Sequence, residues 1–430
     1  MSIPWDMPED SGKPAVDATF EEKAILIGRI GMSMLANGTG AWRIRDAMNK
    51  AARELGISCS ADVGLETIEY TCFCGEEHIS YAFSLRTTGV NTDKLRMLSD
   101  FMHAFPEKAA TKSVREIHDE LETIKRKKGN YTAWQVGLAA AFACSAFTFL
   151  LGGGYPEMIC AFIGAGLGNY VRKKMLERRI ALLACIMVSV AIACAAYVAS
   201  IKLAEFVWGV SSAHQAGYIC AMLFIIPGFP LITGGIDLAK LDMRSGLERL
   251  SYALLIIMVA TFTGFAVASV FRFMPSDFEP LELGITTTLV FRLIASFIGV
   301  YGFSMMFNST PKMAAAAGFV GMIANTLRLE LIDLAGFTIG IAAFIGALTA
   351  GLIAAYLHIR VDMPRITITV PSIVIMVPGL YMYRGVYYLS LANVSDGGLW
   401  LVRAALIVFS LPLGLVVARF LTDRRFRHNL

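Results

Sequence analysis

The chain has 430 residues, of which 56% are hydrophobic and only 17% are charged. Soluble domains are usually about 25% charged, so the composition argues against a cytosolic enzyme. A net charge of +4 is too small to indicate nucleic-acid binding. Charge density is ordinary up to residue 130 and then falls. We therefore expect a soluble part followed by a membrane part with room for about ten helices.

Residues 1–19 contain Asp6, Glu9 and Asp10 and no apolar run, so no signal peptide is expected. This segment is interpreted as a flexible tail on the cytosolic side. The eight cysteines are scattered, and most lie in apolar runs where a thiol behaves as a small hydrophobic group. The sequence therefore predicts no disulfide framework.

Residues 20–130 are predicted to form a small cytosolic α+β domain. Helical spacing of apolar residues alternates with short strand-like segments in this part of the chain. The expected helices are 20–37, 41–55, 91–105 and 113–126, and the expected strands are 57–63, 65–71 and 77–86.

This domain carries no motif that indicates an enzyme. Cys72, Cys74 and His78 have a spacing that could hold a metal, but the second ligand pair of a structural zinc site is missing. We therefore expect ordinary strand cysteines, no metal and no cofactor. Phosphate-loop and nucleophile-elbow patterns are absent from the sequence as well. A regulatory or docking role is expected for the domain.

Ten apolar runs follow, each long enough or nearly long enough to cross a membrane. They are 133–151, 156–171, 180–201, 216–236, 250–271, 285–307, 313–327, 334–357, 366–388 and 400–421. Lysine and arginine concentrate in alternate connections, while the opposite connections carry only Lys202, Arg272 and Arg328. The positive-inside rule then places both termini in the cytoplasm of a bacterium, with the spans in its inner membrane.

An internal repeat links the two halves of the membrane part. Pro227-Gly228 matches Pro378-Gly379 at an offset of 151 residues (227 to 378). Further matches at this offset are Gly234 with Gly385, Gly246 with Gly397, and Ala253 with Ala404. Five spans per copy is an odd number, so the second copy must be inserted upside down. We predict two inverted five-helix repeats, residues 131–271 and 285–422, and a cytosolic tail at 423–430.

The repeated Pro-Gly pairs indicate a substrate site. Proline breaks a helix, and the freed backbone groups need partners that lipid does not offer. Matched broken helices are where secondary transporters bind substrate, so Pro227, Gly228, Pro378 and Gly379 are predicted to line the site. The alternative is a pair of kinks without function.

Polar residues within the spans are further candidates, because buried charge in a membrane is costly. Arg292, Arg384, Asn169 and Asn325 are predicted to contact substrate, the alternatives being snorkelling arginines and interfacial caps.

Two carboxylates, Asp237 at the end of the fourth span and Glu157 at the start of the second, are candidates for carrying a coupling proton. Glu157 also suits a helix N-terminus.

The chain resembles the bacterial threonine/serine exporter family. The segments that carry the resemblance are Ala24–Gly31, Trp42–Met48, Leu55–Ile57, Val90–Leu95 and the two Pro-Gly breaks. The resemblance implies a cytosolic N-terminal domain, ten spans and export driven by the proton gradient. One departure is Arg45, which stands where relatives commonly carry an acidic residue, with Asp46 following.

We therefore predict a proton-coupled antiporter that exports threonine and serine, with protons and the lipid bilayer as partners and assembly into a homo-oligomer left open. Two-protein relatives are linked to dicarboxylate export, so a succinate exporter using Arg292, Arg328 and Arg384 is the alternative. A membrane-tethered enzyme acting through residues 20–128 is a third hypothesis, which the missing motifs disfavour.

Overall fold

The computed structural model describes residues 11–85, 88–209, 211, 214, 217–273, 278, 281–361 and 363–427. Residues 1–10 of the predicted tail, Arg86 of the third predicted strand and residues 428–430 lie outside the described part. The chain divides into two compact units. One contains residues 1–129 and 236–249, and the other contains residues 130–235 and 250–430.

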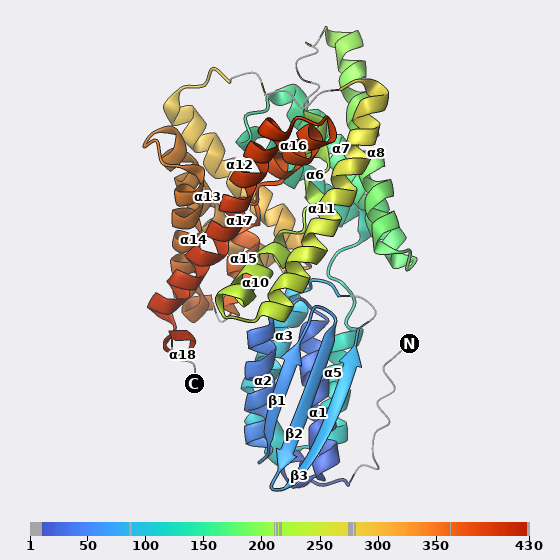
Figure 1. Ribbon diagram of the computed structural model, residues 1–430, viewed down its shortest axis with the longest axis vertical. Coiled ribbons are helices and arrows are strands. Elements are labelled where there is room, and N and C mark those ends of the chain that lie inside the picture. The colour runs from blue at the N-terminus through green and yellow to red at the C-terminus, as the bar shows by residue number, and fades with distance from the viewer. Residues whose placement is uncertain are drawn as a thin grey trace. The chain divides into compact units, whose positions relative to one another are not determined.

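The N-terminal unit is an α+β domain whose helices and strands follow the order expected from the sequence (Figure 1). Its elements are η1 (Ala15–Asp17), α1 (Phe20–Leu35), α2 (Ala41–Glu54), β1 (Ser58–Val63), β2 (Thr67–Cys74), β3 (Glu77–Ser84), α3 (Thr92–His103), α4 (Phe105–Thr111) and α5 (Val114–Arg126). The short helix α4 was not predicted. Pro106 cannot continue α3, but its fixed φ angle suits the first turn of a new helix.

Local signals place the helix starts in this unit. Thr19 and Glu22 form a capping box at the start of α1, and Ser113 and Glu116 form another at the start of α5. The three strands pair antiparallel in the order β1-β2-β3. Alternation along β2 buries Ile68, Tyr70 and Cys72 on one face, as a half-buried strand requires.

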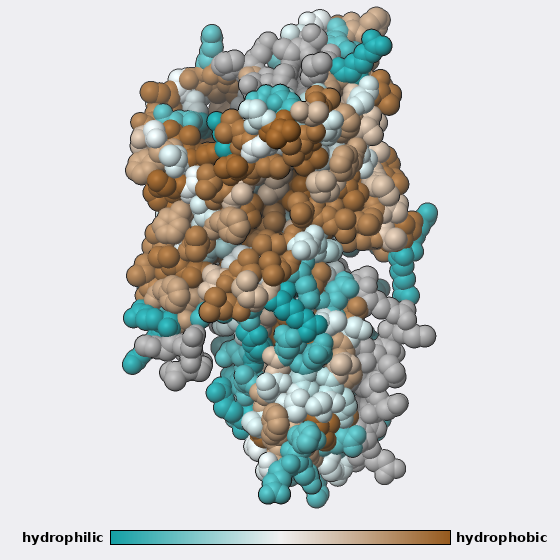
Figure 2. Space-filling view, in the orientation of Figure 1, coloured by the Kyte–Doolittle hydropathy of each residue, from teal (hydrophilic) through white to brown (hydrophobic). Residues whose placement is uncertain are grey.

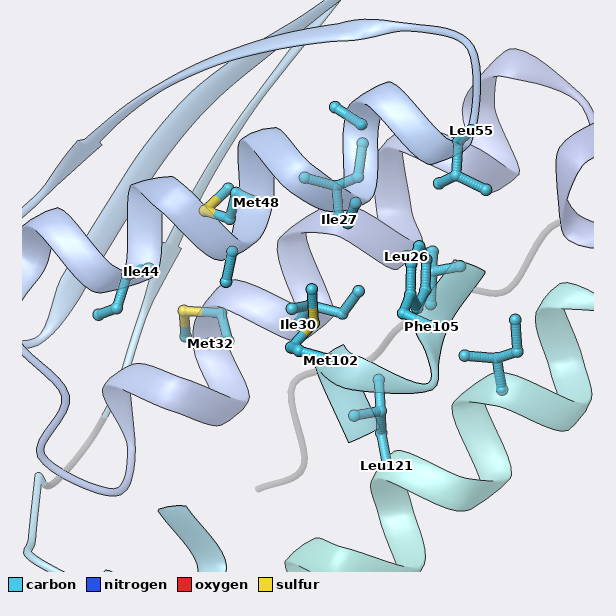
Figure 3. Packing of buried hydrophobic residues seen from close by; sticks show 14 of the residues in the cluster. Leu26, Ile27, Ile30, Met32, Ile44, Met48, Leu55, Met102, Phe105 and Leu121 are labelled. Carbon is cyan, nitrogen blue, oxygen red and sulfur yellow. The ribbon is translucent and has the colours of Figure 1, made fainter. Parts of the chain in front are cut away.

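The core of this unit lies between α1, α2 and the helices that follow the sheet. Figure 3 shows Leu26, Ile27 and Ile30 of α1 packed among side chains that include Phe105 and Leu121. Tyr70 donates a hydrogen bond from its hydroxyl to the carbonyl of Ala24 at 2.9 Å, which joins the sheet to α1.

The second unit is helical. Its elements, including two that extend into residues 236–249, are α6 (Ala133–Leu150), α7 (Tyr155–Glu177), α8 (Leu182–Trp208), α9 (Tyr218–Ala221), η3 (Leu223–Ile225), α10 (Gly228–Ala239), α11 (Met243–Phe271), α12 (Ile285–Met306), α13 (Pro311–Asp333), α14 (Ile339–Val361), α15 (Arg365–Val374), α16 (Gly379–Ser390), α17 (Val394–Thr422) and α18 (Arg424–Arg427). Within this unit, α6 packs against α7 and α12, and α14 packs against α17.

Among the described residues, seven helices are long and apolar enough to cross a membrane, and up to nine if each bent pair counts as one span. The bent pairs are Tyr218–Ile225 with Gly228–Ala239, at 57°, and Arg365–Val374 with Gly379–Ser390, at 48°. Hydrophobic side chains cover the face of these helices seen in Figure 2. The chain is therefore a multi-pass membrane protein. The span expected at 156–171 lies in α7, which is not among the nine.

His118 of α5 is a buried histidine in the N-terminal unit. Arg29 of α1 donates a hydrogen bond from Nη1 to His118 Nδ1 at 2.8 Å, so this nitrogen acts as an acceptor. Burial, and secondly the positive charge of Arg29, lower the pKa of His118 from 6.5 to about 3. The imidazole is therefore neutral in the folded domain at physiological pH.

We predict that the N-terminal unit loses stability as the pH falls from 6.5 towards 3. In this range the unfolded chain binds a proton at His118 and the folded chain does not, so the free energy of unfolding drops by up to about 1.4 kcal/mol per pH unit. The slope is measured from the urea midpoint of unfolding at each pH, with unfolding detected as proteolytic cleavage within residues 11–129. His118→Gln should flatten it, and an unchanged slope in that variant would contradict the assignment.

Candidate transport site and its anchor

The backbone forms the same hydrogen-bonded turn at both helix breaks of the membrane unit. At the first break the amide of Gly228 donates to the carbonyl of Ile226 at 2.8 Å, and at the second Gly379 donates to Val377 at 2.9 Å. Each bond spans one proline, and Pro378 has φ −82° and ψ 54°, which is close to an inverse γ-turn. The turn supplies an internal partner for backbone groups at a position where a continuous helix is impossible.

The hydrogen bonds around the breaks also recur at the 151-residue offset. Upstream, Ile226 donates to Leu223 and Val377 donates to Val374. Downstream, Leu231 donates to Pro227 at 3.1 Å, and Met382 donates to Pro378 at 3.0 Å. The sequence match between the two Pro-Gly segments is therefore a match of backbone structure as well.

The two breaks pack against each other reciprocally. A Cβ on Gly228 would lie 2.9 Å from Val374 Cγ1 and 3.4 Å from Val377 Cγ2. A Cβ on Gly379 would lie 3.1 Å from Leu223 Cδ2 and would overlap Ile226 Cδ1. The two sets of contacts are equivalent under the 151-residue offset, because Leu223 and Ile226 correspond to Val374 and Val377. Glycine is needed at both positions because each break closely approaches the other.

A cavity of about 20 Å³ lies where the breaks cross. It is bounded by the segment before the first break, the start of α16 and one side of α11. The lining residues are Met222, Leu223, Ile225, Ile226, Ile257, Ala260, Thr261, Gly379, Met382 and Tyr383. This volume is enough for a water molecule and too small for an amino acid.

The structure thus brings together the two breaks predicted from the Pro-Gly repeat, and of the four repeat residues Gly379 lines the cavity. Pro227, Gly228, Pro378 and Gly379 are all buried within the helical unit. Buried prolines mean that the broken backbone faces protein side chains, as the hydrocarbon environment demands.

The predicted asparagines do not line this cavity. Asn169 of α7 donates to the carbonyl of Val136 at 3.0 Å, and Asn325 of α13 donates to Ser296 Oγ at 2.9 Å. Arg328 donates from Nε to Asn325 Oδ1 at 3.1 Å. Both asparagines therefore join neighbouring helices, and their predicted role in substrate binding stays a prediction.

The two predicted arginines have different surroundings. Arg292 lies 2.8 Å from Glu330 and also pairs with Asp333, so acidic residues of α13 satisfy its charge. Arg384 is buried, directly follows the cavity-lining Tyr383, and stacks on Trp400 at 4.8 Å from the ring centroid. Of the two, Arg384 is closer in the chain to the cavity.

Asp237 lies in a buried polar network of the N-terminal unit. Arg249 lies with its Nε 3.2 Å from Asp237 Oδ2, and the two residues are 3% and 0% exposed. Ser245 donates to the same carboxylate at 2.9 Å. Arg249 also donates to the carbonyl of Thr39 at 2.8 Å.

The same carboxylate caps a helix that is distant in sequence. The amide of Ala41, the first residue of α2, donates to both oxygens of Asp237 at 3.2 and 3.3 Å across 196 residues of chain. The N-cap residue of α2 is Gly40, which has no side chain to do this. Nearby, Arg45 pairs with Asp242. These contacts favour an anchoring role for Asp237, and its predicted role as a proton carrier stays a prediction.

Glu157 is the second predicted proton carrier, and its partner was not predicted. It is 1% exposed and lies with Oε1 2.6 Å from Nδ1 of His214. A lone histidine between two spans gives no periodic signal, so sequence reasoning missed it.

The cysteine-histidine spacing in the sheet does not converge on one point. Cys72 and Cys74 alternate with Phe73 along β2, whereas His78 of β3 pairs with Phe73. Since successive strand residues face opposite sides, His78 and the two cysteines project from opposite faces. No cluster of three metal-ligating side chains is found among the residues that the structure describes.

Broken helices buried among apolar spans are typical of secondary transporters. Two models of the threonine/serine exporter family match the chain, one over residues 25–273 and the other over residues 292–421. The chain belongs to the threonine/serine exporter family, which is a family of transporters.

Individual relatives are distant. A Mycobacterium tuberculosis protein named "Probable threonine/serine exporter" is 22% identical over 410 residues, covering 92% of this chain and 75% of the relative. The Escherichia coli "Probable succinate transporter subunit YjjP" is 21% identical, covering 58% of this chain and 95% of the relative. "Pheromone-regulated membrane protein 10" of Debaryomyces hansenii is 24% identical, covering 60% of this chain and 27% of the relative. No solved structure matches the chain.

We predict that Asp237→Ala destabilises the N-terminal unit by about 3–5 kcal/mol, because it leaves the Arg249 charge buried and α2 uncapped. Asp62→Ala is the matched control, since Asp62 is half exposed where it pairs with Arg244 and should contribute less than about 1 kcal/mol. Urea midpoints measure both variants. Equal urea midpoints for Asp237→Ala and Asp62→Ala would contradict an anchoring role for Asp237.

We predict that Gly379→Ala destabilises the membrane unit by about 1–3 kcal/mol, because the new methyl group overlaps Ile226. Adding Ile226→Ala in the same chain makes room and should recover part of the loss. Gly398→Ala in α17 is the control, because a Cβ at that position would meet no atom within 4 Å. The melting temperatures of all variants are measured in detergent. Equal melting temperatures for Gly379→Ala and Gly398→Ala would contradict the close contact between the breaks.

Proposed function

We propose that the protein exports threonine and serine across the bacterial cytoplasmic membrane in exchange for protons, with the substrate bound where the two breaks cross. The single observation that carries the proposal is the closed cavity lined by residues of both breaks, in a chain of the exporter family. The name of the mycobacterial relative supports the substrate class.

The chemistry of the breaks suits a zwitterion. Helices α10 and α16 begin at Gly228 and Gly379, so their N-terminal amides and positive dipole ends favour a carboxylate. Carbonyls on the upstream side of each break would accept hydrogen bonds from the ammonium group. Separation of the breaks by a few ångströms would enlarge the cavity to the size of an amino acid.

The proposed topology has ten spans in two inverted five-helix repeats. Nine of these spans are the ones described above, and α7 is the additional one. A helix of 23 residues is about 35 Å long, enough to cross, although its C-terminal end carries Arg172, Lys173 and Lys174. Reciprocal packing of the breaks is what a two-fold axis between the repeats would produce. The lysine and arginine distribution supports a cytoplasmic position for both termini.

Export of a dicarboxylate such as succinate is the second candidate. It is favoured by the names of the Escherichia coli and Klebsiella aerogenes relatives, each a "Probable succinate transporter subunit YjjP". Buried Arg384, next to the cavity-lining Tyr383, is the cation that such a substrate would use.

Counterflow in liposomes tests the proposal. Purified protein is reconstituted with unlabelled threonine inside, and uptake of labelled threonine is measured at equal pH on both sides. We predict uptake that excess serine abolishes and succinate does not, and that Gly228→Leu combined with Gly379→Leu eliminates. Uptake of labelled succinate in place of threonine would support the second candidate, and uptake of neither would refute both.

A further inference from the structure

Glu157 and His214 form a buried acid-base pair that the substrate site does not use. Glu157 is the third residue of α7, and His214 precedes α9 in the chain. Their side chains meet at 2.6 Å between Oε1 and Nδ1. Among the described residues, His214 is the one basic side chain within ion-pair distance of this carboxylate.

The surroundings hold the pair in place. Tyr197 of α8 donates from its hydroxyl to the carbonyl of His214 at 2.7 Å. A Cβ on Gly217 would overlap the Tyr197 hydroxyl oxygen and lie 2.9 Å from Glu157 Cγ, so the chain leading into α9 packs tightly on both. The His214 side chain is 16% exposed and that of Glu157 only 1%, so solvent protons reach the pair through the imidazole.

The other titratable groups facing Glu157 come from each helix around it. They are Cys160 of its own helix, Tyr197 of α8 and Cys220 of α9, and Cys220 interacts in turn with Arg384 of α16. Thiol, phenol and guanidinium groups have ordinary pKa values above physiological pH. The pair joins a carboxylate to an imidazole, the side chain whose ordinary pKa lies nearest to neutral pH.

A hydrogen bond connects this region to the cavity. Tyr218, adjacent to Gly217, shares a 2.7 Å hydrogen bond with Tyr383 across the two halves of the membrane unit. Tyr383 lines the cavity at the crossing of the breaks. The chain segment packed on Glu157 is thus joined by one hydrogen bond to a residue that lines the cavity.

Helix capping alone does not explain the arrangement. Glu157 Oε2 accepts from the amide of Gly154 at 3.0 Å, as in a capping box, but this uses one oxygen only. Helix α13 of the second half also has a proline in its first turn, Pro311, but it is capped by Thr310, and the residue after its proline is the exposed Lys312, where α7 has Glu157 after Pro156. A buried carboxylate is thus not required to start this helix.

We propose that Glu157 and His214 are the proton-binding site of the exporter, loaded from the outer side of the membrane and coupled to the cavity through Tyr218 and Tyr383. This proposal rests on the proposed function. The pair takes up one proton when the substrate site is empty and releases it when substrate binds, so substrate and proton move in opposite directions. With one proton per substrate, a pH difference of about one unit supports a roughly tenfold concentration ratio.

The test uses purified full-length protein in detergent, with threonine binding and proton release measured on the same sample. Wild type should release about one proton per threonine bound, since the pair shares one titrating proton. Glu157→Gln keeps the cap, because glutamine also serves in a capping box, and should bind threonine without proton release. Exposed Glu282→Gln is the matched control and should behave as wild type.

In liposomes, Glu157→Gln should keep threonine counterflow at equal pH and lose accumulation driven by a pH gradient. Proton release equal to that of wild type would overturn the proposal. So would loss of threonine binding in both Glu157→Gln and His214→Gln, because a pair that only carries protons is not needed for binding. Failure of wild type itself to bind threonine would instead count against the proposed function.

Discussion

The structure of the membrane unit depends on two prolines that interrupt helices inside an apolar bundle. Proline removes a donor and frees carbonyls, and hydrocarbon offers no replacement partners. The chain meets this constraint with a γ-turn across each proline and by burying each break against the other. The two breaks are in close contact in this structure. The proposed transport site would open by separation of the breaks.

Helix α10 continues from the first break into the residues that belong to the N-terminal unit. It begins at Gly228, and its last residues include Asp237. There the carboxylate is fixed by Arg249, Ser245 and the first amide of α2. One helix of twelve residues therefore carries both a half of the proposed substrate site and the acidic centre of a buried ion network.

Much of this fold follows from local signals in the sequence. The alternating and helical spacing of apolar residues predicted the three strands and most helices of the N-terminal unit. The repeated Pro-Gly pairs predicted the two helix breaks. Helix α4 was missed because Pro106 looks like a terminator and acts as a helix start. The contacts of Asp237 with Ala41 and of Glu157 with His214 could not be predicted, because these pairs lie 196 and 57 residues apart and no local pattern links them. Cavity size depends on the packing of both breaks and has no sequence signature.

The central claim is that the two breaks form one substrate site. An experimental structure of the protein with threonine bound tests it most directly. The account predicts density for the amino acid between the Leu223–Ile226 segment and the start of α16, with the breaks moved apart. Density in the N-terminal unit, or an unchanged crossing of the breaks with the ligand bound elsewhere, would contradict it.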